Sequence, residues 1–501
     1  MTDPYAWLQP PAYADLPAHF AARQAPAPVT APRLLLWNAP LAAELGLPPV
    51  TAEDAAQLIG GLRLPVAATP VASAYAGHQF GHFVPQLGDG RALLLGDIAR
   101  ADGRRYELQL KGSGRTAFSR GGDGRAALGP VLRETIVSEA MHALGVPTTR
   151  TLGAVASGEQ VMRDQPLPGG VLARLASSHV RVGSFQFFAA RGDIAALKAL
   201  SDWVIARHYP DCAQQPNPAT ALLAAVIGRQ AELIASWMAL GFIHGVMNTD
   251  NMSISGETID YGPCAFLDEY QANKVFSSID RQGRYAYANQ PRIAQWNLTR
   301  LAECLLPLID SDENRAIELA GAELEQFIPC YQAAWLKRMR GKLGLLATQS
   351  QNSVDPEDGQ DASDLGLIGD LLTALEQVEA DYTHTFRTLG ESLRPEFNQS
   401  DSILPKSPAF ERWQLNWLAR LEQQPGGRRA AAEQMRQHNP ALIPRNHQIE
   451  AVIMAAYQGD FAAFEAMYRA CCRPFADGPE QRPYMQPPAP GERVLQTFCG
   501  T

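Results

Sequence analysis

The chain has 501 residues, of which 46% are hydrophobic and 19% are charged, and its formal net charge at pH 7 is −9. This composition is typical of a soluble globular protein, and the length allows several domains or one two-lobed domain with extensions. The negative charge argues against nucleic acid as the main partner, because phosphate backbones bind to basic surfaces.

The sequence carries no recognisable targeting or membrane segment. Its start lacks the basic and apolar regions of a signal peptide, and no run approaches the roughly 18 to 20 apolar residues that span a bilayer. The seven cysteines show no paired spacing, which favours a reducing compartment. We therefore expect a cytoplasmic monomer without membrane partners.

The first part of the chain predicts an extension followed by a small β-rich lobe. Residues 1–70 are rich in Pro and Ala and are expected to wrap around the rest. Short apolar stretches between turn residues predict strands at Leu93–Leu95, Tyr106–Lys111, Val161–Arg163 and Val171–Arg174. Apolar residues near helical spacing predict a helix at Leu128–Leu144, which Gly145 ends. We place this lobe at residues 71–180.

The second part predicts mainly helices. Amphipathic patterns indicate them at Ile194–His208, Ala219–Leu240, Ile293–Leu308, Leu365–Leu389, Phe410–Gln424 and Gln448–Arg469. A short hairpin is expected at Met252–Ile259 and a polar loop at Thr348–Ser363. We place a helical lobe at residues 181–345 and a helical extension with a Pro-rich tail at 346–501. The fold class expected is α+β, with the two lobes of a protein kinase and helical extensions at both ends.

One stretch, residues 241–262, carries the motifs of a kinase-like catalytic centre. Protein kinases place a catalytic loop, H-R-D-x-x-x-x-N, before a metal-binding D-F-G. Here Asn251 closes such a loop, and Asp260 begins the sequence D-Y-G. The usual catalytic Asp is replaced by Val246, so Asp250 is the candidate general base. Asn251 and Asp260 offer hard oxygens on either side of the expected hairpin, which predicts a shared Mg²⁺ or Mn²⁺ site.

Lys111 ends an otherwise apolar strand in a chain where lysine is scarce beside arginine. A solvated strand end would explain it. The functional interpretation is a phosphate-contacting lysine held by a helix carboxylate, as in the Lys–Glu pair of kinases. Glu134 on the following helix is the natural partner, and Glu139 is the alternative further along that helix.

Seven further residues are candidates for contacts with a nucleotide, namely Gly88, Gly90, Arg91, Asp123, Gly124, Arg174 and Arg181. The first three lie in a Gly-Asp-Gly-Arg turn, which alone would suit an ordinary hairpin. Asp123 and Gly124 are expected to open the following helix, either as an anion site or as a simple N-cap. The two arginines suit phosphate oxygens, although surface arginines would look the same.

Two other patterns carry less weight. His78 and His82 have the H-x-x-x-H spacing of a zinc helix, but no Glu lies between them and Gly81 disfavours a helix. The pair Cys471-Cys472 is expected to pack in the core at a helix end.

Taken together, these residues resemble the selenoprotein O family, protein adenylyltransferases with a pseudokinase fold. The resemblance covers nearly the whole chain and rests on the segments His78–Gly81, Pro85–Ala92, Leu110–Thr116, His244–Met252 and Ile259–Pro263. In that family ATP is bound in the reverse orientation to that in kinases. AMP rather than the γ-phosphate therefore passes to a protein hydroxyl.

The resemblance implies roles for the residues named above. The seven candidates, with Lys111 and Asp260, would surround ATP, and Glu134 would hold Lys111. Asn251 and Asp260 would bind the metal, while Asp250 would take the proton of the acceptor Ser, Thr or Tyr.

Some family members carry selenocysteine or cysteine near the C-terminus, and Cys499 matches that place. Some bacterial relatives pair it with a cysteine in the segment after D-Y-G. The corresponding segment here, Lys274–Ser278, has none, which leaves Cys264 as a substitute.

Two alternatives to a metal-dependent protein adenylyltransferase stay open. One is an atypical kinase that transfers the γ-phosphate with Asp250 as base, and the other is a catalytically inactive nucleotide-binding module. The inactive module is disfavoured because binding alone does not need a complete metal site, and the chain keeps Lys111, Glu134, Asn251 and Asp260. The sequence does not reveal the protein substrates or the preference between ATP and UTP.

Overall fold

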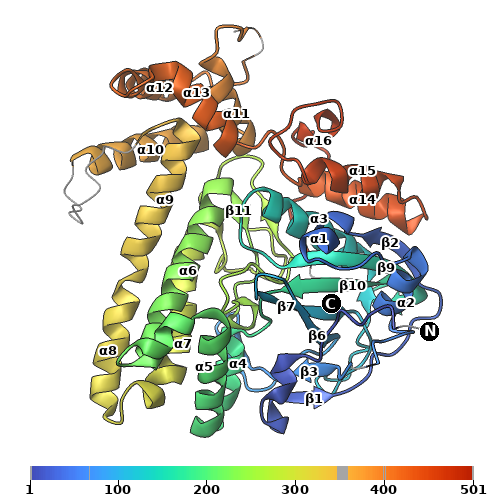
Figure 1. Cartoon of the computed structure of the whole chain (residues 1–501). Coiled ribbons are helices and arrows are strands. Elements are labelled where there is room, and N and C mark those ends of the chain that lie inside the picture. Colours follow the sequence, from blue (N-terminus) through green and yellow to red (C-terminus); the bar gives the residue numbers. More distant parts are fainter. Residues whose placement is uncertain (1–2, 67, 347–358, 399, 401, 499–501) are drawn as a thin grey trace.

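The computed structural model describes residues 3–66, 68–346, 359–398, 400 and 402–498 (Figure 1). The protein is of mixed α+β class. Its strands gather in one part of the molecule, drawn mainly in blue and cyan on the right of Figure 1, and long helices in green and yellow lie on the left.

One antiparallel sheet organises the strands in the order β1-β3-β6-β7-β10-β9-β2, with the short β8 paired to β10. Their bounds are β1 (Ala21–Arg23), β2 (Arg33–Trp37), β3 (Val71–Ser73), β6 (Ala92–Ala99), β7 (Arg105–Lys111), β8 (Ala126–Ala127), β9 (Arg150–Met162) and β10 (Pro166–Ala176). Two small pairs lie apart from it, β4 (Gly77–Gln79) with β5 (His82–Val84), and β11 (Phe242–Ile243) with β12 (Ala265–Phe266). Residues 1–70 thus supply both edge strands of the sheet.

The helices follow in chain order as α1 (Ala39–Glu44), α2 (Ala52–Ile59), α3 (Leu128–Ala143), α4 (Val182–Ala189), α5 (Ile194–His208), α6 (Pro218–Leu240), α7 (Gln290–Ile309), α8 (Glu313–Glu325), α9 (Phe327–Leu343), α10 (Gly359–Gln377), α11 (Tyr382–Ser392), α12 (Pro408–Glu422), α13 (Gly427–His438), α14 (Asn446–Tyr457), α15 (Ala462–Cys471) and α16 (Arg482–Met485). Figure 1 places α5 to α9 beside one another on the left, while α14 and α15 lie on the other side of the molecule and pack against α3.

The sheet is buried on both faces. One face packs against α3, and the other packs against the N-terminal segment, including Tyr5 and Leu8, and against α1 and α2. A strand that is covered on both faces needs no polar alternation. This explains why Leu93–Leu95 is a continuous apolar run in β6.

α6 is the central helix of the helical part. The Asn217 side chain accepts a hydrogen bond from the Thr220 backbone N–H, Pro218 begins the helix, and Gly241 ends it with φ of +72°. Within the described residues, α6 is the single helix long and apolar enough to cross a membrane, and 61% of its apolar window is buried inside the protein. Such burial is the property of a core helix.

α3 is held from outside by the C-terminal helices. A Cβ atom at Gly129 would lie 2.5 Å from the Tyr457 hydroxyl oxygen and 3.0 Å from Ile453 Cγ2, so the lack of a side chain at Gly129 lets α14 pack closely against α3. Arg133 of α3 donates a hydrogen bond to Asn446 at 3.0 Å and forms an ion pair with Glu450. The last third of the chain therefore stabilises the helix that carries Glu134.

The expected hairpin at Met252–Ile259 is wrong. Ser253 and Thr258 do not pair with each other, because Ser253 bridges Arg181 and Thr258 bridges Thr148. Both residues thus pair with a distant part of the chain, and turn signals in the local sequence cannot predict such pairing.

Two expected C-terminal helices are each divided in two. The helix expected at Leu365–Leu389 is split between α10 and α11, and Gln448–Arg469 is split between α14 and α15 near Gly459, which has φ of +88°. The sequence did not predict α13, because this helix has too few apolar residues for a helical period to be recognised. The polar segment Thr348–Ser363 lies mostly outside the described residues, and its last residues belong to α10.

A buried ion pair that joins the C-terminal region to the helical part provides a test of this packing. Arg445, whose side chain is 0% exposed, pairs with Asp268 and Asp381. Arg445→Met leaves both carboxylates unpaired and is expected to cost about 3 to 5 kcal/mol of stability, measured as a lower midpoint of thermal unfolding. The control is Lys198→Met, because the exposed pair with Asp202 is worth less than about 1 kcal/mol. Equal midpoints for the two variants would contradict this account.

Candidate active site

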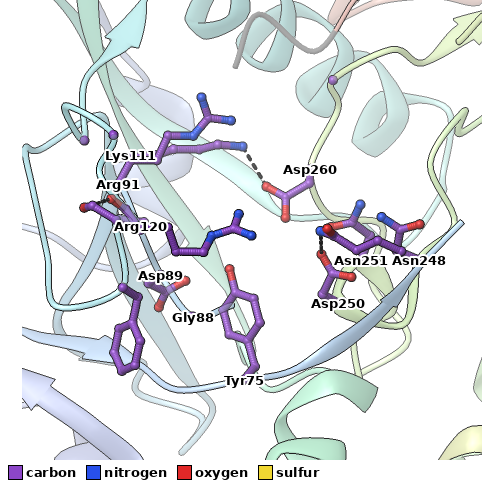
Figure 2. A pocket seen from close by; sticks show the side chains of 18 of the residues that line it. Tyr75, Gly88, Asp89, Arg91, Lys111, Arg120, Asn248, Asp250, Asn251 and Asp260 are labelled. Carbon is purple, nitrogen blue, oxygen red and sulfur yellow. Dashed lines mark hydrogen bonds and ion pairs between the residues drawn. The ribbon is translucent and has the colours of Figure 1, made fainter. Parts of the chain in front are cut away.

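A cavity of about 900 Å³ opens between the sheet and the loop of residues 244–262 (Figure 2). It is lined by all the residues that the sequence suggests for the nucleotide, the metal and the base, namely Gly88, Gly90, Arg91, Lys111, Asp123, Gly124, Arg174, Arg181, Asp250, Asn251 and Asp260. Figure 2 shows Arg91 and Lys111 on one side of the cavity and Asp250, Asn251 and Asp260 on the other.

Lys111 is the last residue of β7, and its ammonium bridges two carboxylates. Its Nζ lies 2.6 Å from Glu134 Oε2 on α3 and 2.6 Å from Asp260 Oδ1. Glu139, the alternative partner, instead pairs with Arg150 at 2.7 Å. Residues five apart on a helix point about 140° away from each other, so only Glu134 faces the cavity side.

Two arginines complete the charged wall. Arg174 Nη1, on β10, donates to Asp260 Oδ1 at 2.6 Å and to Glu134 Oε1 at 3.0 Å. Arg181 Nη1, just before α4, donates to Asp260 Oδ2 at 3.0 Å. With Lys111, three cations therefore surround Asp260, and two further carboxylates pair with them, Glu134 and the buried Asp89, whose Oδ1 lies 3.7 Å from Arg181 Nη2. Such a wall attracts phosphate oxygens.

Asp260 occupies the centre of this wall in an uncommon backbone conformation. Its φ is +64°, in the left-handed region that Asp adopts more readily than most residues. Enclosure by protein alone would raise the pKa of its carboxyl, but the three cations outweigh this effect and hold the pKa well below its ordinary value. The preceding turn is anchored by His244, whose Nε2 lies 2.8 Å from the Ile259 carbonyl oxygen.

Asp250 lies directly before Asn251 and is only 7% exposed. Burial raises the pKa of its carboxyl to about 6, so the group is ionised at neutral pH yet more basic than an ordinary Asp. Gln79 Nε2 donates to its Oδ2 at 3.3 Å, and in the described part of the chain its buried Oδ1 has no hydrogen-bond partner. Buried polar atoms without partners are rare, and Asp250 itself lines the cavity, so its carboxylate is a candidate proton acceptor for a hydroxyl group bound there.

Asn251 is oriented by the loop itself. Its Nδ2 donates to the Val246 carbonyl oxygen at 3.0 Å, which leaves the amide oxygen for the cavity. Among the described residues, no group of three or more His, Cys, Asp and Glu side chains is arranged to hold a metal ion. A cation bound at Asn251 and Asp260 would therefore need further oxygens from a ligand.

The glycines of the Gly88–Gly90 turn allow two loops to pack closely. A Cβ atom at Gly88 would lie 2.3 Å from the Phe118 ring, and one at Gly90 would lie 2.9 Å from the Phe118 carbonyl oxygen. The intervening Asp89 donates its backbone N–H to the Ser73 carbonyl oxygen at 3.0 Å. The turn therefore runs beside β3 and is not a simple hairpin between two strands.

The expectation that Asp123 and Gly124 open the following helix is wrong. α3 begins after Ala127, which makes no side-chain cap, and β8 lies in between. Gly124, with φ of +69°, instead closes a loop by accepting a hydrogen bond from the Gly114 N–H at 3.0 Å. Asp123 pairs with Arg163 at 2.9 Å. No helix N-terminus lies directly behind these two residues.

Several residues that line the cavity were not among the predicted site residues, namely Tyr75, Gln79, Asp89, Arg120, Met162, Arg163 and Asn248. Gln79 lies in the segment His78–Gly81, which carries part of the family resemblance, so the sequence did contain a signal for it. His78 lies 2.7 Å from Gln186 through its Nδ1. Met162 ends β9 and Arg163 follows it, and nothing in their local sequence marks them as cavity residues.

The C-terminal tail reaches the site. Cys499 lies outside the described residues, so its redox role stays a prediction. Thr497, two residues earlier, donates through Oγ1 to the Pro263 carbonyl oxygen at 2.6 Å and through its N–H to the Phe276 carbonyl oxygen at 2.8 Å. The tail thus lies against the segment that follows D-Y-G and contains the buried Cys264.

Comparison with known proteins identifies the family. The family profile described as protein adenylyltransferase SelO matches residues 7–471. Relatives named protein nucleotidyltransferase YdiU are 55% identical over 500 residues in Methylorubrum extorquens, 54% over 494 residues in Rhodopseudomonas palustris and 56% over 493 residues in a Bradyrhizobium species. In each case 98% of both chains is covered. The chain therefore belongs to the SelO family of protein adenylyltransferases, enzymes that transfer AMP to proteins.

Proposed function

We propose that this nucleotidyltransferase binds ATP in the cavity and transfers AMP to Ser, Thr or Tyr hydroxyls of protein substrates. The observation that carries the proposal is the convergence of Lys111, Arg174 and Arg181 on Asp260, with the Asp250 carboxylate on the same cavity. The cations suit a triphosphate, and the carboxylate suits an acceptor hydroxyl.

The arrangement corresponds to the two lobes of a protein kinase. Residues 71–180 form the β-rich N-lobe and residues 181–345 the helical C-lobe, with residues 1–70 and 346–501 as extensions. The position of the cavity between the sheet and the 244–262 loop supports this division.

The proposed nucleotide contacts are Gly88, Gly90, Arg91, Lys111, Asp123, Gly124, Arg174, Arg181 and Asp260. The cavity has a buried charged end, where Arg174 and Arg181 are 2% and 3% exposed, and an open end, where Met162 is 64% exposed. At the open end Asp123 and Arg163 neutralise each other. We therefore place the β- and γ-phosphates of ATP at the buried end and its adenine at the open end. This is the reverse of the orientation of ATP in a kinase.

Asn251 and Asp260 are proposed to hold Mg²⁺ or Mn²⁺ together with the phosphates. The donor set fits, because an amide oxygen and a carboxylate are hard ligands of the kind these cations prefer. When bound, such an ion neutralises charge that develops on the phosphate chain.

In the proposed step, the acceptor oxygen attacks the α-phosphorus while Asp250 takes its proton. The bond between the α-phosphorus and the oxygen that bridges to the β-phosphate breaks, and pyrophosphate leaves against the Lys111–Arg174 wall. The base stands four residues after Val246, the usual place of the kinase Asp. The reacting phosphorus in this proposal is the α-phosphorus and not the γ-phosphorus of a kinase reaction, so a general base at a different position in the loop is expected.

Labelled ATP distinguishes this reaction from the alternatives. With Mg²⁺ or Mn²⁺ present, we expect label from [α-³²P]ATP to stay on polypeptide after denaturing electrophoresis and label from [γ-³²P]ATP to be lost with pyrophosphate. Retention of the γ label would indicate an atypical kinase. ATP binding without transfer of either label would indicate an inactive nucleotide-binding module.

Asp250→Asn tests the general base. Removing a base of this kind is expected to slow AMP transfer by about 10² to 10⁴, whereas ATP affinity stays the same because the cation wall is intact. The rate is measured by incorporation of α label and the affinity by equilibrium binding. Asp202→Asn, in an exposed pair, is the control. A variant at Asp250 with full activity would rule out this role.

Asp260→Asn tests the metal site while keeping the left-handed backbone, which Asn also tolerates. We expect at least about 100-fold slower transfer, the scale on which one electrostatic contact acts, with the response to added Mn²⁺ lost. ATP binding in EDTA should persist, because Lys111, Arg174 and Arg181 remain while one of the carboxylates that neutralise them is lost. An unchanged Mn²⁺ response would exclude Asp260 as a ligand.

A further inference from the structure

The β4–β5 hairpin lies against the loop that carries Asp250, although 171 residues separate Gln79 from Asp250. Three successive hairpin residues bond three successive loop residues, in the pairs His78–Thr249, Gln79–Asp250 and Phe80–Asn248. The hairpin is therefore part of the wall of the site and not a remote surface feature.

The backbone of the hairpin is held in place without the Gln79 side chain. The His78 N–H donates to Thr249 Oγ1 at 2.7 Å, and the Phe80 N–H donates to Asn248 Oδ1 at 3.0 Å. Gln186 of α4 reinforces the His78–Thr249 contact. Its Nε2 lies 2.7 Å from His78 Nδ1, and its Oε1 accepts a hydrogen bond from Thr249 Oγ1 at 2.5 Å. The side chain at position 79 is thus free to serve another purpose.

That side chain reaches one oxygen of Asp250. Gln79 lines the cavity, and its Nε2 donates to Asp250 Oδ2 at 3.3 Å. A side-chain amide N–H stabilises the ionised form of a carboxylate and fixes its rotation. The bond therefore keeps one oxygen engaged and defines where the other one lies.

The other oxygen rests against Gly77. A Cβ atom at Gly77 would lie 2.4 Å from Asp250 Oδ1, and all three of its nearest atoms would belong to Asp250. Any larger residue would push the carboxylate out of position, because a short Asp side chain has little freedom to yield. Gln79 and Gly77 thus confine the carboxylate from two directions.

We propose that Gln79 and Gly77 are positioning residues for AMP transfer, which aim the Asp250 carboxylate at the acceptor hydroxyl. This inference rests on the proposed role of Asp250 as the base. It assigns a catalytic purpose to the hairpin, whereas a purely structural hairpin would need only the backbone contacts of His78 and Phe80.

Gln79→Met tests the bond, because Met has the length of Gln but cannot donate. We expect kcat for AMP transfer to fall roughly 10- to 100-fold, the cost of a misplaced catalytic group, with ATP affinity and the midpoint of thermal unfolding unchanged. Gly77→Ala should lower kcat at least as much by displacing Oδ1. The matched control is His82→Met on the same hairpin, because His82 is exposed and should change neither quantity.

A double-mutant cycle separates positioning from structural support. If Gln79 acts only through Asp250, then Gln79→Met should cause no further loss in the Asp250→Asn background. An Asp250→Asn variant with full activity would remove the proposed base and this inference together. A slow Asp250→Asn variant combined with wild-type rates for Gln79→Met and Gly77→Ala would overturn this inference alone. Loss of ATP affinity or of thermal stability that matches the loss of kcat would also overturn it.

Discussion

The structure of the site depends on one buried carboxylate surrounded by cations. Asp260, on the helical side of the cavity, accepts from Lys111, Arg174 and Arg181, which come from the sheet and the segment after it. Buried cations are costly unless they are paired, so this contact joins the two sides of the cavity. It also gathers three cationic side chains on one wall of the cavity.

α3 supplies a second carboxylate to the cation wall, and the last third of the chain holds α3 in place. Glu134 bonds both Lys111 and Arg174, so the register of α3 sets the position of the phosphate wall. The outer side of α3 is covered by α14, through the Arg133–Asn446 hydrogen bond and the close approach at Gly129. The C-terminal helices are distant in sequence from the residues that line the cavity. They nevertheless help to position those residues by packing against α3.

The reactive side of the cavity is built differently from a kinase. An apolar Val246 occupies the usual place of the kinase base. Asp250, four residues later, is buried, its carboxyl pKa is raised, and one of its oxygens has no hydrogen-bond partner among the described residues. The hairpin around Gln79 encloses this carboxylate. The proposed AMP transfer needs a base near the α-phosphorus, and the positions of Asp250 and of the buried cation wall are compatible with that requirement.

The sequence by itself determined the chemistry and the regular helices. The spacing of Lys111, Asp250 and Asp260 within short motifs identifies the charged groups, and the 3.6-residue period locates α5 and α6, because both signals are local. Only the tertiary structure decided which distant groups meet, as with the separate bridges formed by Ser253 and Thr258 and the approach of Gln79 to Asp250. Such contacts depend on how whole elements pack, and the residues next to them in the chain carry no record of that packing.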